Sequence, residues 1–168
     1  MSRDSNNYFV TFIDEKSKCT WVTFLPSKDR VLDAFITFQN YVTNQFNVKL
    51  KVFRSDNGGE YTSNKFKEHL ANHDILHQTS CPYTPQQNGV AERKNRHLME
   101  VARSMMFHSN VPERYWGDAV LTACYLINRT PTKVLLDKSP FEVLNQVKPS
   151  ISHLRVFCYC RRTNNQAR

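Results

Sequence analysis

The sequence lacks any apolar run of about 18 residues, the length that crosses a membrane. Residues 1–7 are polar, so we expect no secretory signal. Neither an internal repeat nor a linker interrupts the 168 residues, which are enough for one domain with its own core. These absences predict an intracellular, single-domain protein without a membrane partner.

The five cysteines form an odd set without the spacing of secreted proteins, so we expect reduced thiols. Zinc is the first alternative to consider, because His69, His73 and His77 are spaced by four residues. The helix they would share is expected to end near Asn72, and no cysteine or carboxylate completes the set. A zinc site is therefore not expected.

Basic residues outnumber acidic ones, with 23 Lys and Arg against 15 Asp and Glu. The formal net charge is +8 and the isoelectric point is near 9.4. Such a balance favours an anionic partner, nucleic acid before a membrane surface. A basic soluble protein without such a partner would show the same balance, so charge leaves both readings open.

The pattern of apolar residues predicts strands and helices in alternation. Strand, helix, strand in this order suggests a right-handed crossover and a mixed sheet, an α/β fold. Ser27, Ser63 and Ser139 are expected to cap helices. The expected strands are 8–13, 20–25, 50–54, 75–79 and 154–159, and the expected helices begin near residues 27, 63, 89, 112 and 139.

Two short segments contain the candidate catalytic residues. Asp56 follows an apolar run and is followed closely by two glycines, and Glu92 lies in the first turn of a basic helix. Hard divalent cations take carboxylate oxygens that converge from different elements. Asp56 and Glu92 are therefore the candidate catalytic and metal-binding pair.

The helix that carries Glu92 also carries basic residues away from its buried stripe. We expect Arg93, Lys94, Arg96 and Arg103 to contact DNA phosphates. Arg96 is four residues from Glu92, so the two share a face of the helix. They either form a surface ion pair or place an arginine on the phosphate beside a metal.

The chain contains, in this order, the segments RSDNGGEY, PYTPQQNGVAERKNR, NRTPTK, SPFEVL and SHLRVF. Together these segments resemble the integrase catalytic core of copia-type LTR retrotransposons, a part of the Pol polyprotein. The resemblance implies a ribonuclease H-like fold, a mixed sheet flanked by helices. It places the core at residues 8–160, and the polar tail of residues 161–168 is expected to be disordered. It also implies DNA as the partner, with Mg²⁺ or Mn²⁺ as cofactor.

The family's second metal carboxylate falls on Asp56 and its third on Glu92, with thirty-five residues between them. The family's first aspartate lies on a preceding strand in a D-x-x-G-P setting, and no such motif precedes Tyr8. The tempting Asp14 matches the hairpin turn of the family. We therefore expect an N-terminally truncated core that lacks the first strand and one metal ligand.

The loop before the basic helix offers two further polar residues. Gln87 and Asn88 could reach bases or sugar hydroxyls, or they could serve only loop structure and helix capping. Both readings stay open.

Three functions compete. The resemblance implies DNA binding and metal-dependent polynucleotidyl transfer, which trims LTR ends and joins them to target DNA. Because one carboxylate is missing, we expect the chain to be inactive alone. The alternatives are a non-catalytic nucleic-acid-binding remnant of a transposable element and a nuclease that shares the fold. A homo-oligomer, and a location in the nucleus or in cytoplasmic retroelement particles, follow from the resemblance only.

Overall fold

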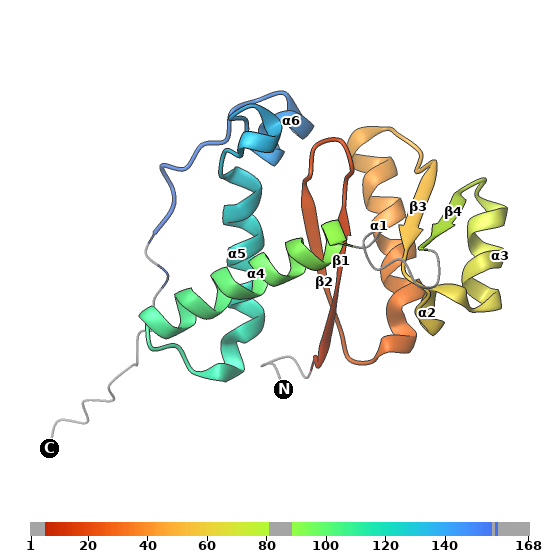
Figure 1. The fold of residues 1–168 in the computed structure, drawn as a ribbon, viewed down its shortest axis with the longest axis horizontal. Coiled ribbons are helices and arrows are strands. Elements are labelled where there is room, and N and C mark those ends of the chain that lie inside the picture. The colour runs from red at the N-terminus through yellow and green to blue at the C-terminus, as the bar shows by residue number, and fades with distance from the viewer. Residues whose placement is uncertain (1–5, 81–88, 156, 158–168) are drawn as a thin grey trace, which may run out of the picture. The chain divides into compact units, whose positions relative to one another are not determined.

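The computed structural model describes residues 6–80, 89–155 and 157. Contacts divide this part of the chain into two compact units, one of residues 6–13, 21–80 and 89–96 and one of residues 14–20, 97–155 and 157. Figure 1 labels the strands and α-helices. With the short 3-10 helices, marked η, the elements are β1 (Tyr8–Ile13), β2 (Thr20–Leu25), η1 (Lys28–Arg30), α1 (Val31–Phe46), β3 (Val52–Ser55), α2 (Gly59–Thr62), α3 (Asn64–Asn72), β4 (Leu76–Thr79), α4 (Gly89–His108), η3 (Glu113–Tyr115), α5 (Trp116–Arg129), η4 (Lys133–Leu135) and α6 (Pro140–Asn145).

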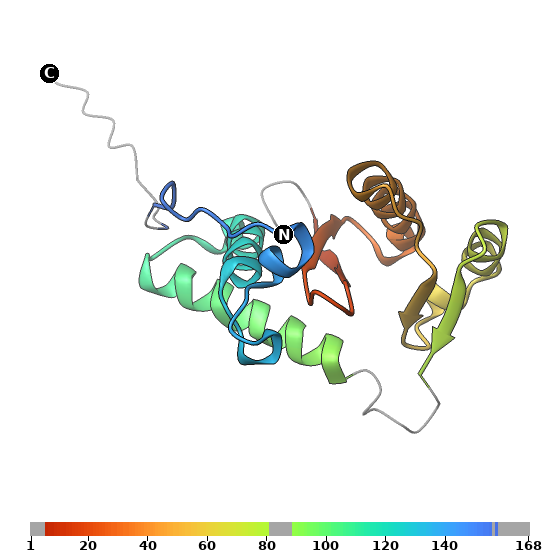
Figure 2. The same ribbon diagram turned by 90° about the horizontal axis from the view of Figure 1, so that it is seen from above.

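The strands of the first unit form two separate pairs. β1 pairs with β2 as the predicted hairpin, and β3 pairs in parallel with β4. The register of the second pair sets Phe53 opposite His77 and Ser55 opposite Thr79. Figure 2 shows β3 and β4 side by side in a second view. Within the described residues, the expected mixed sheet is thus split into two two-stranded sheets.

An aromatic core holds the first unit together. Phe35 on α1 is fully buried, and its ring centroid lies 4.7 Å from that of Phe53 and 5.2 Å from that of Phe66. Phe12 and Phe38 stack with 4.3 Å between their centroids. These residues come from β1, α1, β3 and α3, so burial of their rings fixes the hairpin and the β3–β4 pair on α1.

The second unit is built on α5. Buried Asn128 accepts a hydrogen bond from the backbone N–H of Thr20 at 2.9 Å and donates one to the Thr20 carbonyl at 2.7 Å. The guanidinium of Arg129 lies 3.4 Å from the ring centroid of Tyr125 and 4.5 Å from that of Phe141 on α6. These contacts join the 14–20 turn and α6 to α5.

The expected caps are confirmed at two of three positions. Ser63 accepts a hydrogen bond from the Phe66 N–H, and Ser139 accepts one from the Glu142 N–H. Ser27 makes no capping bond to the helix that it precedes, and α1 begins only at Val31, after the short helix η1. The expected last strand is wrong at residues 154, 155 and 157, which lie in no strand, and 156, 158 and 159 fall outside the described residues.

No helix in the described ranges has both the length and the apolar character needed to span a membrane. The three histidines that are spaced by four residues do not lie on one helix. The rings of His69 and His73 lie 4.2 Å apart, whereas His77 lies on β4 with its ring stacked on Phe53.

Candidate active site

Asp56 directly follows β3 and exposes its side chain. Its Oδ1 accepts a hydrogen bond from the Gly58 N–H at 3.0 Å. A Cβ added to Gly58 would lie 3.0 Å from this oxygen and 2.9 Å from Oε2 of Glu60. The absence of a side chain at Gly58 therefore lets two carboxylates approach the same point of the backbone.

A hollow of about 220 Å³ borders Asp56. Five consecutive residues of β1, 8–12, and four consecutive residues, 53–56, line it. Because successive side chains of a strand point to opposite faces, a run of neighbours along one hollow means that the hollow lies at the backbone edge of each strand. The two sheets thus present open edges to one hollow, which Asp56 also lines.

Tyr61 also lines this hollow. Burial raises the pKa of its phenol to about 12, with the negative charges of Asp56 and Glu60 adding to the effect. The hydroxyl therefore keeps its proton at neutral pH and remains a hydrogen-bond donor beside the two carboxylates.

The first turns of α4 reach the same hollow. Ala91 and Asn95 line it, whereas Glu92, between them in sequence, is exposed and does not. The structure thus brings the helix that carries Glu92 to Asp56 without turning the Glu92 side chain into the hollow. That Asp56 and Glu92 act as one metal-binding pair stays a prediction.

Asn95 is a polar residue of this region that sequence reasoning missed. Its Oδ1 accepts a hydrogen bond from the hydroxyl of Thr11 on β1 at 2.8 Å. This bond orients the side chain and leaves the amide N–H groups as donors. The spacing of three residues from Glu92 on one helix could have suggested it.

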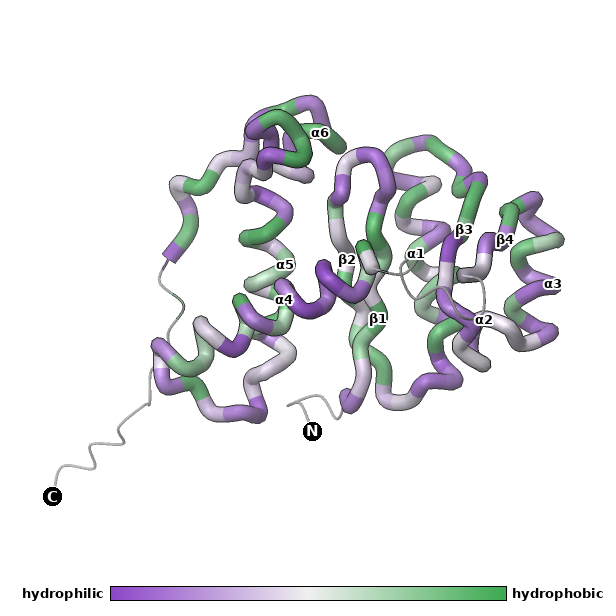
Figure 3. The backbone as a smooth tube through the Cα atoms, in the orientation of Figure 1, coloured by the Kyte–Doolittle hydropathy of each residue, from purple (hydrophilic) through white to green (hydrophobic). Residues whose placement is uncertain are grey.

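The predicted DNA-contacting residues lie along α4. Arg93, Arg96 and Arg103 are exposed, and Lys94 is half-buried. Arg93 donates from Nε to the Gly89 carbonyl at 3.0 Å, which holds it against the helix start. Figure 3 shows how hydrophilic much of this helix is. Gln87 and Asn88 lie outside the described residues.

Asp14 closes the turn of the β1–β2 hairpin. Its Oδ2 accepts hydrogen bonds from the Ser17 N–H at 2.7 Å and from the Ser17 hydroxyl at 2.6 Å, and its N–H donates to the Cys19 carbonyl. These bonds confirm that Asp14 is a turn residue.

A family model described as Integrase core domain matches residues 1–85 of the sequence, half of its length. The chain belongs to the integrase core domain family. The prediction of the family is thereby confirmed.

Its curated relatives are much longer proteins. This integrase core is 49% identical, over 156 residues, to the Retrovirus-related Pol polyprotein from transposon TNT 1-94 of Nicotiana tabacum. The match covers 93% of this chain and 12% of that protein. It is 42% identical, over 161 residues, to the Retrovirus-related Pol polyprotein from transposon RE1 of Arabidopsis thaliana. That match covers 95% of this chain and 11% of that protein. The chain therefore spans only a small part of these relatives.

Solved structures confirm the ribonuclease H-like fold. One is the cryoEM structure of a simian T-cell lymphotropic virus intasome in complex with PP2A regulatory subunit B56 gamma, with a TM-score of 0.67 and 19% identity over 92% of this chain and 52% of that one. Another is the HTLV-2 integrase catalytic core domain in complex with magnesium in a trimeric form, with a TM-score of 0.61 and 16% identity. That match covers 79% of this chain and 81% of the other.

The residues of this integrase core fit a divalent cation in kind but not in number. Asp56 and Glu92 offer the carboxylate oxygens that Mg²⁺ and Mn²⁺ prefer. Across the described ranges, however, no three His, Cys, Asp or Glu side chains converge on a point that could hold a metal ion. The described residues therefore do not form a complete metal centre by themselves.

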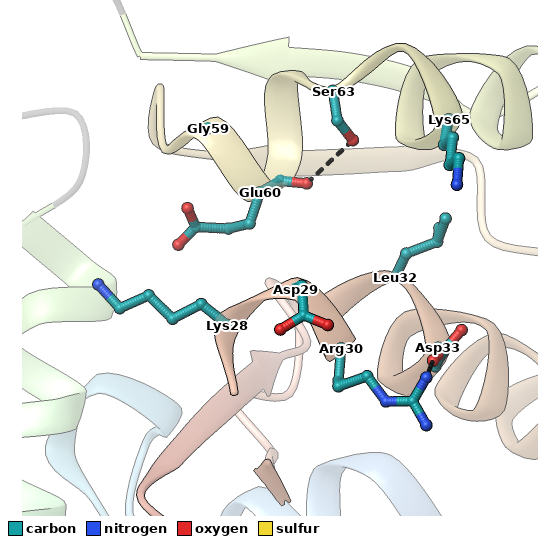
Figure 4. A pocket seen from close by; sticks show the side chains of 9 residues that line it. All are labelled: Lys28, Asp29, Arg30, Leu32, Asp33, Gly59, Glu60, Ser63 and Lys65. Atoms are coloured by element: carbon teal, nitrogen blue, oxygen red, sulfur yellow. Dashed lines mark hydrogen bonds and ion pairs between the residues drawn. The ribbon is translucent and has the colours of Figure 1, made fainter. Parts of the chain in front are cut away.

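A second hollow, of about 590 Å³, lies between the start of α1 and α2 (Figure 4). Its charged lining residues carry equal numbers of each sign, and Arg30 is held by Asp33 at 3.0 Å. A balanced lining gives no preference for a phosphate or for a cation. These charged residues are Lys28, Asp29, Arg30, Asp33, Glu60 and Lys65.

Proposed function

We propose that the chain is the catalytic core of a copia-type LTR retrotransposon integrase and acts on DNA in polynucleotidyl transfer. The observation that carries this proposal is the hollow that Asp56 shares with the first turns of α4, the helix that carries Glu92. The thirty-five residues between the two carboxylates support it further, because this is the interval implied by the resemblance.

In the proposed reaction, a 3′ hydroxyl of LTR-end DNA attacks a phosphodiester of target DNA in line with the leaving oxygen. A new 3′ O–P bond forms as the attacking hydroxyl loses its proton, the old P–O bond breaks, and the leaving 3′ oxygen takes a proton. Asp56 and Glu92 would hold the divalent ion, which when bound stabilises charge on the attacking and leaving oxygens. Exposed Arg96 would bind the neighbouring phosphate.

We further propose that a third carboxylate comes from a strand other than the four that the structure describes. Two carboxylates leave a two-metal centre short of anionic ligands, so we expect the isolated chain to lack strand-transfer activity. The test is joining of LTR-end oligonucleotides to target DNA in Mg²⁺ or Mn²⁺. Robust joining that Glu92→Gln abolishes would show that two carboxylates suffice and overturn this expectation.

A second candidate function is DNA binding without catalysis. It is favoured by the incomplete group of carboxylates in the described residues together with the exposed arginines of α4. In this case affinity for duplex DNA should fall steeply with salt and should not depend on sequence. A flat plot of log K against log salt would contradict DNA binding through phosphates.

The arginines offer a matched comparison for this measurement. Arg96→Ala should lower the affinity and reduce the salt slope by about one unit if Arg96 neutralises one phosphate. Arg30→Ala is the control, because Arg30 is equally basic and exposed but is paired with Asp33. Equal losses in the two variants would mean that the binding follows net charge alone.

The same proposal includes the DNA partners, the oligomeric state and the location of the protein. LTR ends and target DNA would be the partners, and the chain would act as a homo-oligomer in the nucleus or in cytoplasmic retroelement particles. Sedimentation with and without LTR-end DNA tests the oligomer. A monomer under both conditions would count against it.

A further inference from the structure

Ser55 and His77 form a part-buried polar contact next to Asp56 in the chain. Ser55 is only 9% exposed, and its Oγ lies 2.9 Å from Nε2 of His77. The same hydroxyl donates to the backbone carbonyl of Asp56 at 2.9 Å. Parallel pairing of β3 with β4 sets His77 opposite Phe53, and their rings stack with 5.6 Å between centroids. The stacking fixes where the imidazole can point.

The direction of these hydrogen bonds follows from counting protons. A serine hydroxyl has one hydrogen, and here it is given to the Asp56 carbonyl. The Ser55 oxygen must then accept a hydrogen from Nε2 of His77, which requires the imidazole to carry its proton there. The chain of donors therefore runs from His77 to Ser55 to Asp56.

Two more bonds hold the same loop to the end of β4. The side-chain amide of Asn57 donates to the Ser80 carbonyl at 2.7 Å, and the Ser80 N–H donates to the Ser55 carbonyl at 3.2 Å. Within the loop, the Gly58 N–H donates to Oδ1 of Asp56. The carbonyl of Asp56 is thus fixed by Ser55 while its carboxylate is fixed by Gly58.

We infer that His77 is a positioning residue for Asp56, acting through the Ser55 hydroxyl to hold the Asp56 peptide and so the direction of its carboxylate. The inference rests on the proposed function, since it takes Asp56 as a metal ligand. Nothing in that function assigns a role to His77 or Ser55. Ser55 lines the hollow of about 220 Å³ and His77 does not, so His77 would act on the site only through Ser55.

The test separates the hydrogen bond from the packing of the ring. His77→Phe keeps a flat ring against Phe53 and removes the donor, whereas His77→Gln restores a donor at a similar distance. The matched control is His69→Phe. His69 also packs on an aromatic ring, that of Phe35, and bonds to Gln39, with no link to Asp56.

The measurement is amide hydrogen exchange by NMR at Gly58, whose N–H is bonded to Asp56, together with broadening of that signal by Mn²⁺. In His77→Phe we expect exchange at Gly58 to rise about fivefold to tenfold, the equivalent of one lost hydrogen bond, and broadening to weaken. His77→Gln should return both toward the wild-type values. His69→Phe should leave both unchanged.

Three results would overturn the inference. These are unchanged exchange at Gly58 in His77→Phe, an equal rise in His69→Phe, and a uniform loss of protection along β3 and β4, which would mean a structural role only. Absence of Mn²⁺ broadening in the wild-type chain would instead count against the metal ligand of the proposed function. The exchange comparison would still decide the role of His77.

Discussion

Replacing Gly58 with alanine tests whether the backbone at this point is kept bare for the two carboxylates. The backbone of Gly58, with φ −55° and ψ 140°, is open to any residue, so alanine adds no conformational strain. The effect must therefore come from the new methyl group, which would lie 2.9 Å from Glu60 Oε2 and 3.0 Å from Asp56 Oδ1. Both distances are too short for ordinary contact.

The two carboxylates differ in how easily they can yield. Glu60 has a longer side chain and can swing away at little cost. Asp56 cannot move its Oδ1 without stretching the 3.0 Å bond from the Gly58 N–H, which is worth about 1 kcal/mol. Alanine also raises the free energy of unfolding by about 0.4–1 kcal/mol, because it lowers the conformational entropy of the unfolded chain. The two terms nearly cancel, so we expect little change in the free energy of unfolding of Gly58→Ala.

Gly59→Ala is the matched control, because a Cβ at Gly59 meets nothing within 4 Å. It keeps the gain of about 0.4–1 kcal/mol without the loss, so it should be the more stable variant by about 1 kcal/mol in urea unfolding. Broadening of the amide signals around residue 58 by Mn²⁺ should weaken in Gly58→Ala only. Equal stability and equal broadening in the two variants would refute the reasoning.

Three further changes test other parts of the molecule. Asn128→Ala removes two hydrogen bonds from the buried peptide of Thr20 and should lower the free energy of unfolding by about 2–4 kcal/mol in urea, with loss below 1 kcal/mol as the contradicting result. Tyr61 holds its proton to about pH 12 in the fold and to about pH 10 when unfolded, so stability should fall as the pH rises through this window, and Tyr61→Phe should lessen that fall. Thr11→Val removes the bond to Asn95 and should cost about 1 kcal/mol while shifting the NMR signals of the Asn95 amide; unchanged signals would contradict the contact.

Local sequence signals predicted the elements well where the cause is local. The hairpin strands have the predicted bounds, and the caps at Ser63 and Ser139 depend on residues only three positions away. β3 was expected at 50–54 and lies at Val52–Ser55. Its bounds depend on pairing with β4, twenty-four residues later, which no local pattern records.

The candidate site shows the same division. Asp56 was placed correctly at a strand end, because an apolar run followed by a carboxylate and glycines is a local signal. Asn95 was missed, because its role depends on Thr11, eighty-four residues away. Glu92 is exposed and does not line the hollow although its helix reaches it, and the direction of an exposed side chain is not set by sequence spacing.

The split of the sheet and the shortage of carboxylates have one common explanation that can be tested. Residues 8–12 and 53–56 turn their backbone edges to one hollow, so a strand placed there could bond to both. If that strand carried an aspartate near Asp56, it would also supply the third metal ligand. We therefore expect a longer polypeptide, with a strand of D-x-x-G-P sequence ahead of residue 1, to protect the amides of β1 and β3 from exchange and to bind Mn²⁺ more tightly. Replacing only the added aspartate with asparagine should keep the protection and lose the tighter binding. Protection no greater than in the present chain would mean that the two edges do not take a strand between them.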